Sequence, residues 1–229
     1  MNAYNSVITN MTFLSKDVVE ITFKIENGQM DFTPGQFILV EVSTQLSVMR
    51  AYSVLDYNLG TNEIKIAVKK VENGEATTII FNDFKVGMNI KLMGAMGNEL
   101  IVNKSDEELV LVATGIGITP ILCILNDLIA SNYKGKVDFL YGARTLDELF
   151  YSSEIEEIAK NHENIKFIPV LSREKCDGVK FGYVTDIIKD MSLENKSIYM
   201  CSSKTVATSF KNTLIDLKFD INKFKCESA

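Results

Sequence analysis

The pattern of apolar residues changes partway along this chain, and that change constrains the fold more than any other feature. Before residue 103, apolar and polar residues alternate over short segments such as 19–25 and 64–68. This is the period of a strand with one buried face. Turn-forming Asn, Gly and Pro residues separate these segments. Closely spaced alternating strands predict an antiparallel barrel or sandwich for residues 1–103.

The pattern after the polar stretch 103–108 is that of an α/β domain. Residues 109–113 are continuously apolar, as expected for a parallel strand covered on both faces. Further short apolar runs are separated by segments with helical character, at residues 120–131, 153–160, 185–190 and 205–217. This alternation predicts a second domain, residues 104–229, with a doubly wound sheet.

Composition and charge narrow the classes of function. The 229 residues include 24 basic and 30 acidic side chains, a net charge of −6. Such a balance argues against nucleic acid as a partner, because that binding depends on Lys and Arg. No apolar run approaches the roughly 20 residues that span a bilayer, and the N-terminus lacks a signal-peptide pattern. We therefore expect a cytoplasmic protein without a membrane partner.

Residue types that usually perform metal or acid–base chemistry are scarce. The four cysteines lie far apart with no CxxC pair, and the single histidine, His162, lies in a polar stretch. This spacing predicts free thiols and no metal site, which fits a reducing compartment. The chemistry of this chain is therefore expected to be largely that of a bound cofactor.

Two motifs are suited to binding a phosphate-bearing cofactor. Arg50-Ala51-Tyr52-Ser53 offers a cation, an aromatic ring and a hydroxyl, with Arg50 and Tyr52 on one face of an extended strand and Ser53 on the other. The plainer alternative is a strand with an exposed Arg and a core Tyr. The second motif is a glycine-rich turn between an apolar strand and a helix, a context that suits a dinucleotide pyrophosphate. Its residues include Thr114, Gly115, Gly117, Thr119 and Pro120.

The order and separation of these motifs resemble the ferredoxin–NADP reductase family, in which a flavin barrel precedes a nicotinamide-nucleotide domain. Residues 32–37 resemble that family's x-P-G-Q-[FY] barrel motif, and residues 74–77 its phosphate-binding G-x-x-[ST] turn. The resemblance implies two domains, an antiparallel β-barrel FAD-binding domain followed by an α/β doubly wound nucleotide-binding domain. It also implies the cofactors FAD and NAD(P)H.

The resemblance further implies roles for residues of the barrel. Arg50 is expected to pair with the FAD pyrophosphate, Tyr52 to lie against the isoalloxazine ring, and Ser53 to hydrogen-bond near flavin N5. The rest of the implied FAD-binding set is Ala51, Val68, Gly74, Thr77 and Thr78. The two threonines are also candidates for ordinary helix N-caps.

In the second domain the resemblance assigns the glycine-rich turn to NAD(P)H and Arg144 to the adenosine side. Ser172 and Arg173 resemble the pair that holds the 2′-phosphate in NADP-specific relatives. An arginine is the natural receptor for that phosphate, so we expect a slight preference for NADPH. Glu174, beside Arg173, keeps NADH open as the alternative.

Three residues are implied to form a catalytic cluster around the flavin: Ser53, Cys201 and Glu227. Cys201 occupies the place of the family's C-G-P motif, with two serines following it. The plainer alternatives are a small buried Cys201 and a frayed Glu227. Plant-type members end in an aromatic residue that covers the flavin. The corresponding Ala229 predicts an open hydride-transfer face and some electron leak to O₂.

The expected function is that of an FAD-dependent NAD(P)H oxidoreductase. Electrons pass through the flavin to a separate redox protein such as ferredoxin or flavodoxin, or to another enzyme subunit. Two alternatives stay open at this point. One is a flavin reductase that uses flavin as a substrate, and the other is a non-catalytic electron-transfer subunit of a larger complex.

Overall fold

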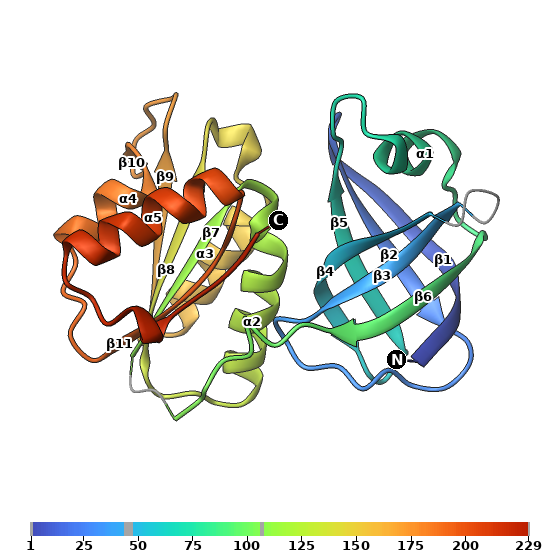
Figure 1. Cartoon of the computed structure of the whole chain (residues 1–229), viewed down its shortest axis with the longest axis horizontal. Coiled ribbons are helices and arrows are strands. Elements are labelled where there is room, and N and C mark those ends of the chain that lie inside the picture. The colour runs from blue at the N-terminus through green and yellow to red at the C-terminus, as the bar shows by residue number, and fades with distance from the viewer. Residues whose placement is uncertain (1, 44–47, 106–107, 229) are drawn as a thin grey trace. The chain divides into compact units, whose positions relative to one another are not determined.

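The computed structural model describes residues 2–43, 48–105 and 108–228. Its contacts divide the chain into two compact units, Met1–Ile101 and Val102–Ala229 (Figure 1). The boundary predicted from the sequence, after residue 103, lies two residues further along the chain. Each unit is a complete fold with a core of its own.

The first unit is a closed antiparallel barrel. Its strands follow the order β1-β2-β5-β4-β3-β6 around the barrel, and every pair of neighbours is antiparallel. The elements are β1 (Asn2–Ser15), β2 (Val18–Ile25), β3 (Phe37–Ser43), β4 (Val48–Asn58), β5 (Glu63–Lys69), α1 (Glu75–Asp83) and β6 (Asn89–Met96). The predicted β-barrel is confirmed.

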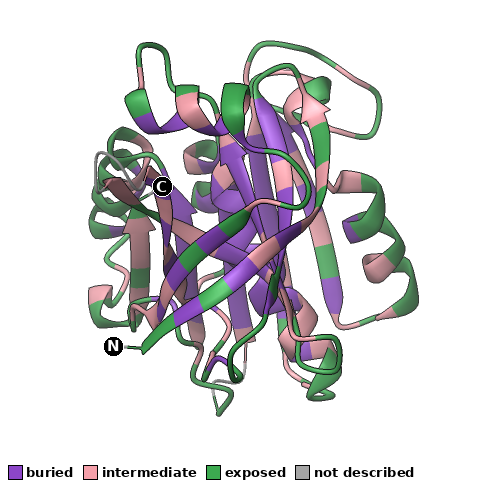
Figure 2. Cartoon of the chain, turned by 90° about the vertical axis from the view of Figure 1, so that its right-hand side faces the viewer, coloured by how far each residue is buried: buried purple, intermediate pink, exposed green. Residues whose placement is uncertain are grey.

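Alternation along the strands fills the inside of this barrel. On β2, Ile21 and Phe23 are fully buried while Lys24 is exposed. On β5, Ile64 and Ile66 are fully buried in the same way. Figure 2 shows buried and exposed positions alternating along the strands. The side-chain period of two places the apolar set in the core.

The second unit is an all-parallel sheet with helices on both faces. The strand order is β10-β9-β8-β7-β11-β12, and all neighbours are parallel. Its elements are β7 (Glu108–Thr114), α2 (Ile118–Ala130), β8 (Lys136–Ala143), α3 (Ser152–Asn161), β9 (Ile165–Leu171), β10 (Lys180–Phe181), α4 (Val184–Ile187), β11 (Lys196–Ser202), α5 (Lys204–Asp216) and β12 (Phe224–Ser228).

The two faces of the sheet carry different helices. Val110 and Val112 of β7 share a buried cluster with Phe210 and Leu214 of α5, and α4 and α5 lie over the same face (Figure 1). Alternate residues of β7 point to the opposite face, where α2 packs. The doubly wound α/β domain predicted from the sequence is confirmed. Among the helices of the described residues, none is long and apolar enough to cross a membrane.

The chain reverses direction across this sheet beside β7. Strands β7, β8, β9 and β10 are added outward on one side, and the chain then returns to place β11 and β12 on the other side of β7. In such a sheet, ligands bind at the carboxyl ends of the strands where the order reverses. The turn after β7 and the loop after β11 flank that point.

Candidate cofactor-binding site

Strand β4 carries the predicted flavin motif, and Tyr52 packs against the barrel core. Arg50 and Ala51 are exposed and Tyr52 and Ser53 are partly buried. The Arg50 Nη1 donates to the Met49 carbonyl oxygen over 2.9 Å. Burial raises the pKa of Tyr52 to about 12, and the positive charge of Arg50 acts in the opposite direction. The Tyr52 hydroxyl is therefore protonated at neutral pH, and Arg50 lies close enough for its charge to reach it.

The segment at residues 32–37 fixes β4 in place. Gly35 has a φ of +97°, and a Cβ there would lie 2.5 Å from the Leu100 carbonyl oxygen. The Gln36 side chain donates to the Gly97 carbonyl oxygen at 3.1 Å, and the Gln36 carbonyl accepts the Val54 N–H at 3.2 Å. Residues 32–37 therefore connect β4 to the loop after β6, and these contacts hold β4 in position.

Helix α1 begins at a turn that offers backbone donors. A Cβ on Gly74, its N-cap, would lie 2.9 Å from the Thr77 Oγ1. Thr77 is buried, and its hydroxyl accepts the Val71 N–H at 3.1 Å and donates to the Gly74 carbonyl at 3.2 Å. Thr78 is exposed. Because the Thr77 hydroxyl is engaged within the turn, an anion would be bound here by the N–H groups of the first helical turn. The exposed Thr78 lies beside them.

Val68 lies inside the barrel core with 1% of its surface exposed. Its place in the FAD-binding set stays a prediction, and its side chain faces the other core residues.

The glycine-rich turn after β7 needs its two glycines for different reasons. Gly115 has a φ of +55°, and nothing lies within 4 Å of a Cβ placed there. A Cβ on Gly117 would overlap the carbonyl oxygen of Cys201 on β11. Thr119, which is buried, donates its hydroxyl to the Ile116 carbonyl at 3.0 Å. Gly117 therefore lets the turn pack directly against the end of β11, at the point where the strand order reverses.

Thr114 ends β7 and is partly buried, and Pro120 is buried near the start of α2. The proline lies within the first helical turn, where the missing N–H leaves no hydrogen bond unmade.

Arg144 and Arg173 are neighbours at the ends of β8 and β9. The Arg144 guanidinium forms a two-pronged ion pair with Glu148, with Nη2 at 2.6 Å and Nε at 3.0 Å from the carboxylate oxygens. This pair raises the pKa of Arg144. Ser172 Oγ donates to the Ala143 carbonyl at 3.4 Å. The Glu174 carboxylate accepts the Leu146 N–H at 2.8 Å, so this acidic group holds the neighbouring loop.

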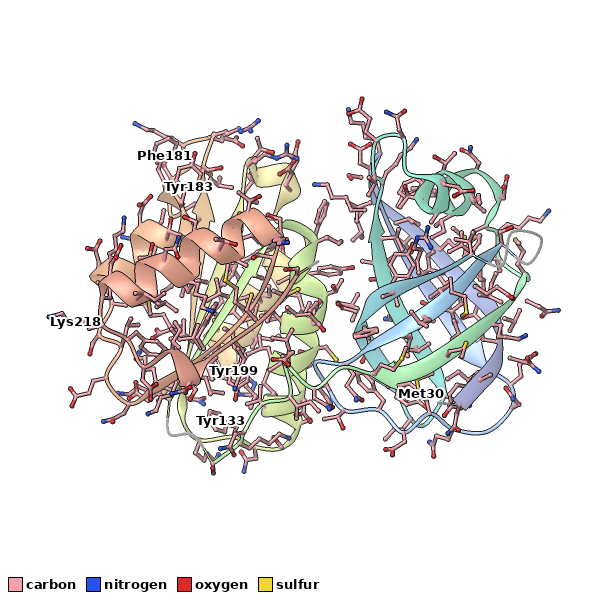
Figure 3. The ribbon with its side chains drawn as sticks, viewed as in Figure 1. Met30, Tyr133, Phe181, Tyr183, Tyr199 and Lys218 are labelled. Atoms are coloured by element: carbon pink, nitrogen blue, oxygen red, sulfur yellow. The ribbon has the colours of Figure 1, made fainter. Side chains whose placement is uncertain are left out.

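Aromatic and basic side chains continue this edge of the sheet. Phe181 is 55% exposed and Tyr183 is 63% exposed, and both lie at the β10 end of the sheet (Figure 3). The Lys175 Nζ lies 5.1 Å from the centre of the Phe181 ring. The edge formed by β8, β9 and β10 therefore presents cations and flat apolar rings to solvent.

Cys201 and Glu227 are partners in adjacent strands, β11 and β12. Cys201 is fully buried. Burial raises the pKa of its thiol, and the nearby Glu227 carboxylate raises it further, so the thiol is protonated. Glu227 lies within β12 and not in a frayed tail. Ala229 lies outside the described residues. The grouping of Ser53 with these two residues stays a prediction.

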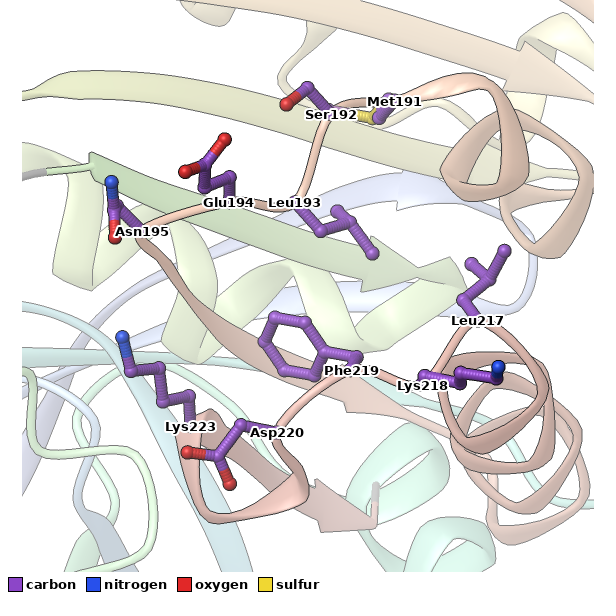
Figure 4. A pocket seen from close by; sticks show the side chains of 10 residues that line it. All are labelled: Met191, Ser192, Leu193, Glu194, Asn195, Leu217, Lys218, Phe219, Asp220 and Lys223. Atoms are coloured by element: carbon purple, nitrogen blue, oxygen red, sulfur yellow. The ribbon is translucent and has the colours of Figure 1, made fainter.

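A hollow of about 490 Å³ lies at the other end of the second unit (Figure 4). It is formed by the segments that precede β11 and β12, so it opens at their amino ends. None of the predicted site residues lines it. Within residues 2–43, 48–105 and 108–228, no group of His, Cys, Asp or Glu side chains is arranged to hold a metal ion.

Comparison with known proteins assigns both units. Residues 5–100 match the model of the oxidoreductase FAD-binding domain, and residues 111–211 match that of the oxidoreductase NAD-binding domain. The chain belongs to the ferredoxin–NADP reductase-like family of flavoprotein oxidoreductases. The family assignment, the fold and the cofactors FAD and NAD(P) expected from the sequence are confirmed.

Relatives of this flavoprotein include several reductases. The propane 2-monooxygenase reductase component of Mycolicibacterium smegmatis is 29% identical over 197 residues, which are 82% of this chain and 56% of that protein. The CDP-6-deoxy-L-threo-D-glycero-4-hexulose-3-dehydrase reductase of Yersinia pestis is 27% identical over 227 residues, 96% of this chain and 67% of that protein. The chain thus spans about 56 to 67% of the length of these two relatives.

Solved structures share the fold. The Amycolatopsis cytochrome P450 reductase GcoB has a TM-score of 0.90 at 20% identity, covering 99% of this chain and 69% of that chain. A ferredoxin NADP⁺ reductase from Neisseria gonorrhoeae, with bound FAD and NADP, has a TM-score of 0.88 at 18% identity, covering 100% and 99%.

The flavoprotein's own residues fit these cofactors. At Gly74 and Gly117 a Cβ would collide with neighbouring atoms, so in both turns the main chain packs closely enough that only glycine is accommodated. Each turn also opens a helix, whose first N–H groups favour phosphate. Arg50 and Arg173 are exposed, so their guanidinium groups are available for charge-assisted bonds to phosphate.

Proposed function

We propose that this chain is an FAD-dependent NAD(P)H oxidoreductase that passes electrons through its flavin to a separate acceptor. The observation that carries the proposal is the packing of Gly117 against Cys201 at the reversal point of the sheet. It gives the second unit a closely packed dinucleotide turn in a chain whose first unit is an FAD-binding barrel.

Each residue of the proposed site has a positioning or electrostatic task. Arg50 and the start of α1 hold the FAD pyrophosphate, Tyr52 supports the isoalloxazine ring, and Ser53 donates near flavin N5. The turn at Gly115 and Gly117 holds the coenzyme pyrophosphate. When bound, FAD accepts a hydride from the reduced nicotinamide and releases electrons to the acceptor.

The proposed tasks of Cys201 and Arg173 follow from their surroundings. The Cys201 thiol is protonated and fully buried, so it supports the end of β11 beside the nicotinamide site without adding a charge there. Arg173 is exposed at the edge that carries Lys175 and Phe181, and it receives the 2′-phosphate of NADPH. The Glu174 carboxylate is held by the Leu146 N–H, and with Arg173 exposed beside it we propose a slight preference for NADPH over NADH.

The acceptor is proposed to be a separate redox protein in the cytoplasm, either an iron–sulfur or flavin carrier such as ferredoxin or flavodoxin, or a catalytic component. The propane 2-monooxygenase relative is named as a reductase component, which supports the second kind. That name also favours one alternative, an electron-transfer subunit that works only within a larger complex. The flavin-reductase alternative is disfavoured by the exposed Arg50 and the α1 turn, because a loosely held flavin substrate needs no pyrophosphate clamp.

The test begins with the absorption spectrum of the purified protein after gel filtration. We expect flavin bands that remain with the protein, followed by rapid bleaching when NADPH is added without oxygen. NADPH oxidation with an artificial dye as acceptor then separates a self-sufficient reductase from a subunit that needs its complex. A protein that is colourless, and that binds no FAD when FAD is added, contradicts the proposal. Turnover only with free flavin supports the flavin-reductase alternative.

A further inference from the structure

Tyr141 is the largest fully buried side chain among the described residues. It lies near the carboxyl end of β8, level with Ala113 of β7 and Pro169 of β9. Its neighbour Leu140 packs into the cluster beneath α4 and α5. Tyr141 therefore faces the other side of the sheet, where α2 packs.

The hydroxyl of Tyr141 bridges two loops at this end of the sheet. It lies 3.3 Å from the Gly115 carbonyl oxygen in the turn after β7, and 3.2 Å from the Glu148 carbonyl oxygen in the loop after β8. Its single hydrogen is shared between these two acceptors, and the backbone of Phe150 also hydrogen-bonds to the hydroxyl. Burial raises the pKa of Tyr141 well above its usual range. The hydroxyl therefore keeps its proton at neutral pH and is able to donate.

The bond to Gly115 fixes the orientation of a peptide group. The Gly115 carbonyl also accepts the Ile118 N–H, and the shared Tyr141 hydroxyl is its second donor. Because a trans peptide is planar, its C=O and N–H point in opposite directions. With the Gly115 carbonyl held toward Tyr141, the Ile116 N–H points away from the sheet core. Gly115 has no side chain to hold this peptide by packing, and the hydrogen bonds to its carbonyl oxygen orient it.

The contact with the Glu148 carbonyl links Tyr141 to the part of the site that contains Arg144. The Glu148 carboxylate holds the Arg144 guanidinium at 2.6 and 3.0 Å. The hydroxyl of Tyr141 holds the backbone of the same residue. One buried hydroxyl thus joins the glycine-rich turn to the residue that orients Arg144.

We propose that Tyr141 is a positioning residue for the coenzyme, whose hydroxyl holds the Gly115 peptide so that the Ile116 N–H faces the dinucleotide pyrophosphate. This inference rests on the proposed function, since it concerns the coenzyme turn of the same site. Tyr141 does not touch the coenzyme and takes no part in the redox step. It acts through the geometry of the turn.

The test uses the protein carrying Tyr141→Phe, which keeps the ring and removes only the hydroxyl. We would measure the Kd of the oxidised coenzyme, of ADP-ribose and of AMP, each with the 2′-phosphate if the protein prefers NADP. The first two ligands contain a pyrophosphate and AMP does not. Loss of one hydrogen bond of ordinary strength predicts a rise of about 5- to 10-fold in the Kd of both pyrophosphate ligands, with AMP unchanged. The kcat at saturating coenzyme should change by less than about 2-fold, because the interaction is one of binding.

Tyr199→Phe is the matched control. Tyr199, labelled in Figure 3, is a buried tyrosine of the same sheet, and its hydroxyl accepts the Asn103 N–H at 3.0 Å, away from the turn. It should lose stability without a change in any of the three Kd values. Amide hydrogen exchange in the ligand-free protein gives a second readout, and Tyr141→Phe should speed exchange of the peptide that contains residues 115–118.

Two results would overturn the inference while leaving the proposed function in place. In the first, Tyr141→Phe binds ADP-ribose as tightly as the wild type does. In the second, it loses AMP and ADP-ribose equally, or Tyr199→Phe behaves in the same way, which indicates general destabilisation. If the wild-type protein binds neither coenzyme, the proposed function fails and the inference fails with it.

Discussion

The backbone N–H of Arg173 donates to the carbonyl oxygen of Arg144 over 2.9 Å. This bond joins the end of β9 to the end of β8 and places two arginines next to each other in space. Their side chains are in different states. Arg144 is engaged by the Glu148 carboxylate, whereas Arg173 is exposed with Lys175 nearby in the chain.

The first prediction is that Arg173→Ala lowers kcat/KM for NADPH by about 10- to 100-fold, the effect of losing a charged bond to phosphate worth about 1.5–3 kcal/mol. The value for NADH should change by less than about 3-fold, because NADH has no 2′-phosphate. Arg144→Ala is the control, and its smaller effect should fall on both coenzymes. A wild-type preference for NADH, or an equal loss for both coenzymes in Arg173→Ala, would show that Arg173 does not receive the phosphate.

The second prediction is that Arg50→Ala releases FAD. Removing one partner of a charge pair at a binding interface costs about 2–5 kcal/mol, so the purified variant should be largely colourless. Coenzyme binding to the second unit, measured by calorimetry, should be retained. Lys24→Ala removes an exposed charge from another barrel strand and should keep its flavin. Full flavin occupancy in Arg50→Ala would mean that the arginine is an ordinary surface residue.

The third prediction compares the two glycines of the turn after β7. Gly117→Ala forces a methyl group into the Cys201 carbonyl, and overpacking of this kind costs about 1–3 kcal/mol. We expect a lower thermal midpoint and little coenzyme binding. Gly115→Ala meets open space but a φ of +55°, so it should cost about 1 kcal/mol and weaken binding less. The reverse order of the two effects would indicate that the turn and β11 are not in contact.

The fourth prediction concerns alkaline pH. The pKa of Cys201 is raised by burial and by Glu227, whereas an unfolded cysteine ionises near about 8.5. Below that pH the thiol is protonated in both states and its contribution to stability is complete. Above it the unfolded state loses the proton first, so the free energy of unfolding falls by up to about 1.4 kcal/mol per pH unit.

Urea titrations at several pH values from neutral to alkaline test this. Cys201→Ala should be less stable at neutral pH, but its free energy of unfolding should fall less steeply as the pH rises. Cys226, whose pKa burial raises to about 11, contributes in the same direction, as do the buried hydroxyls of Tyr52 and Tyr141, so some slope remains in the variant. Parallel curves for the wild type and Cys201→Ala would show that this thiol titrates normally.

Both folds could be predicted from the sequence because the local spacing of apolar residues differs between the two units. Alternation defined β2 and β5, and the continuous apolar run defined β7. Strand β12 was not predicted, since Phe224–Ser228 contains a lysine and a glutamate and reads as a polar tail. Its pairing with β11 is a tertiary effect that no window of sequence contains.

The site was predicted at the level of motifs and not of contacts. The resemblance located Thr77 at the phosphate turn, but only the structure shows its hydroxyl engaged by Val71 and Gly74. Gln36, Tyr141 and Glu148 were not predicted to support the site. Tyr141 lies in an apolar strand, where a tyrosine reads as a core residue. What distinguishes Tyr141 from an ordinary core tyrosine is that its hydroxyl lies between the loops after β7 and β8. This position depends on the order of the strands in the sheet, which the local sequence does not contain.

The contact between Gly117 and Cys201 also bears on how this protein is made. The glycine turn emerges early in synthesis of the second unit, but β11, the strand against which it packs, follows only after α2, β8, α3, β9, β10 and α4. Long-range contacts of this kind form late, after the intervening loop is closed. A nascent chain would therefore hold its flavin barrel complete while its coenzyme turn still lacked a partner. The coenzyme turn would be complete only after β11 had left the ribosome and joined the sheet.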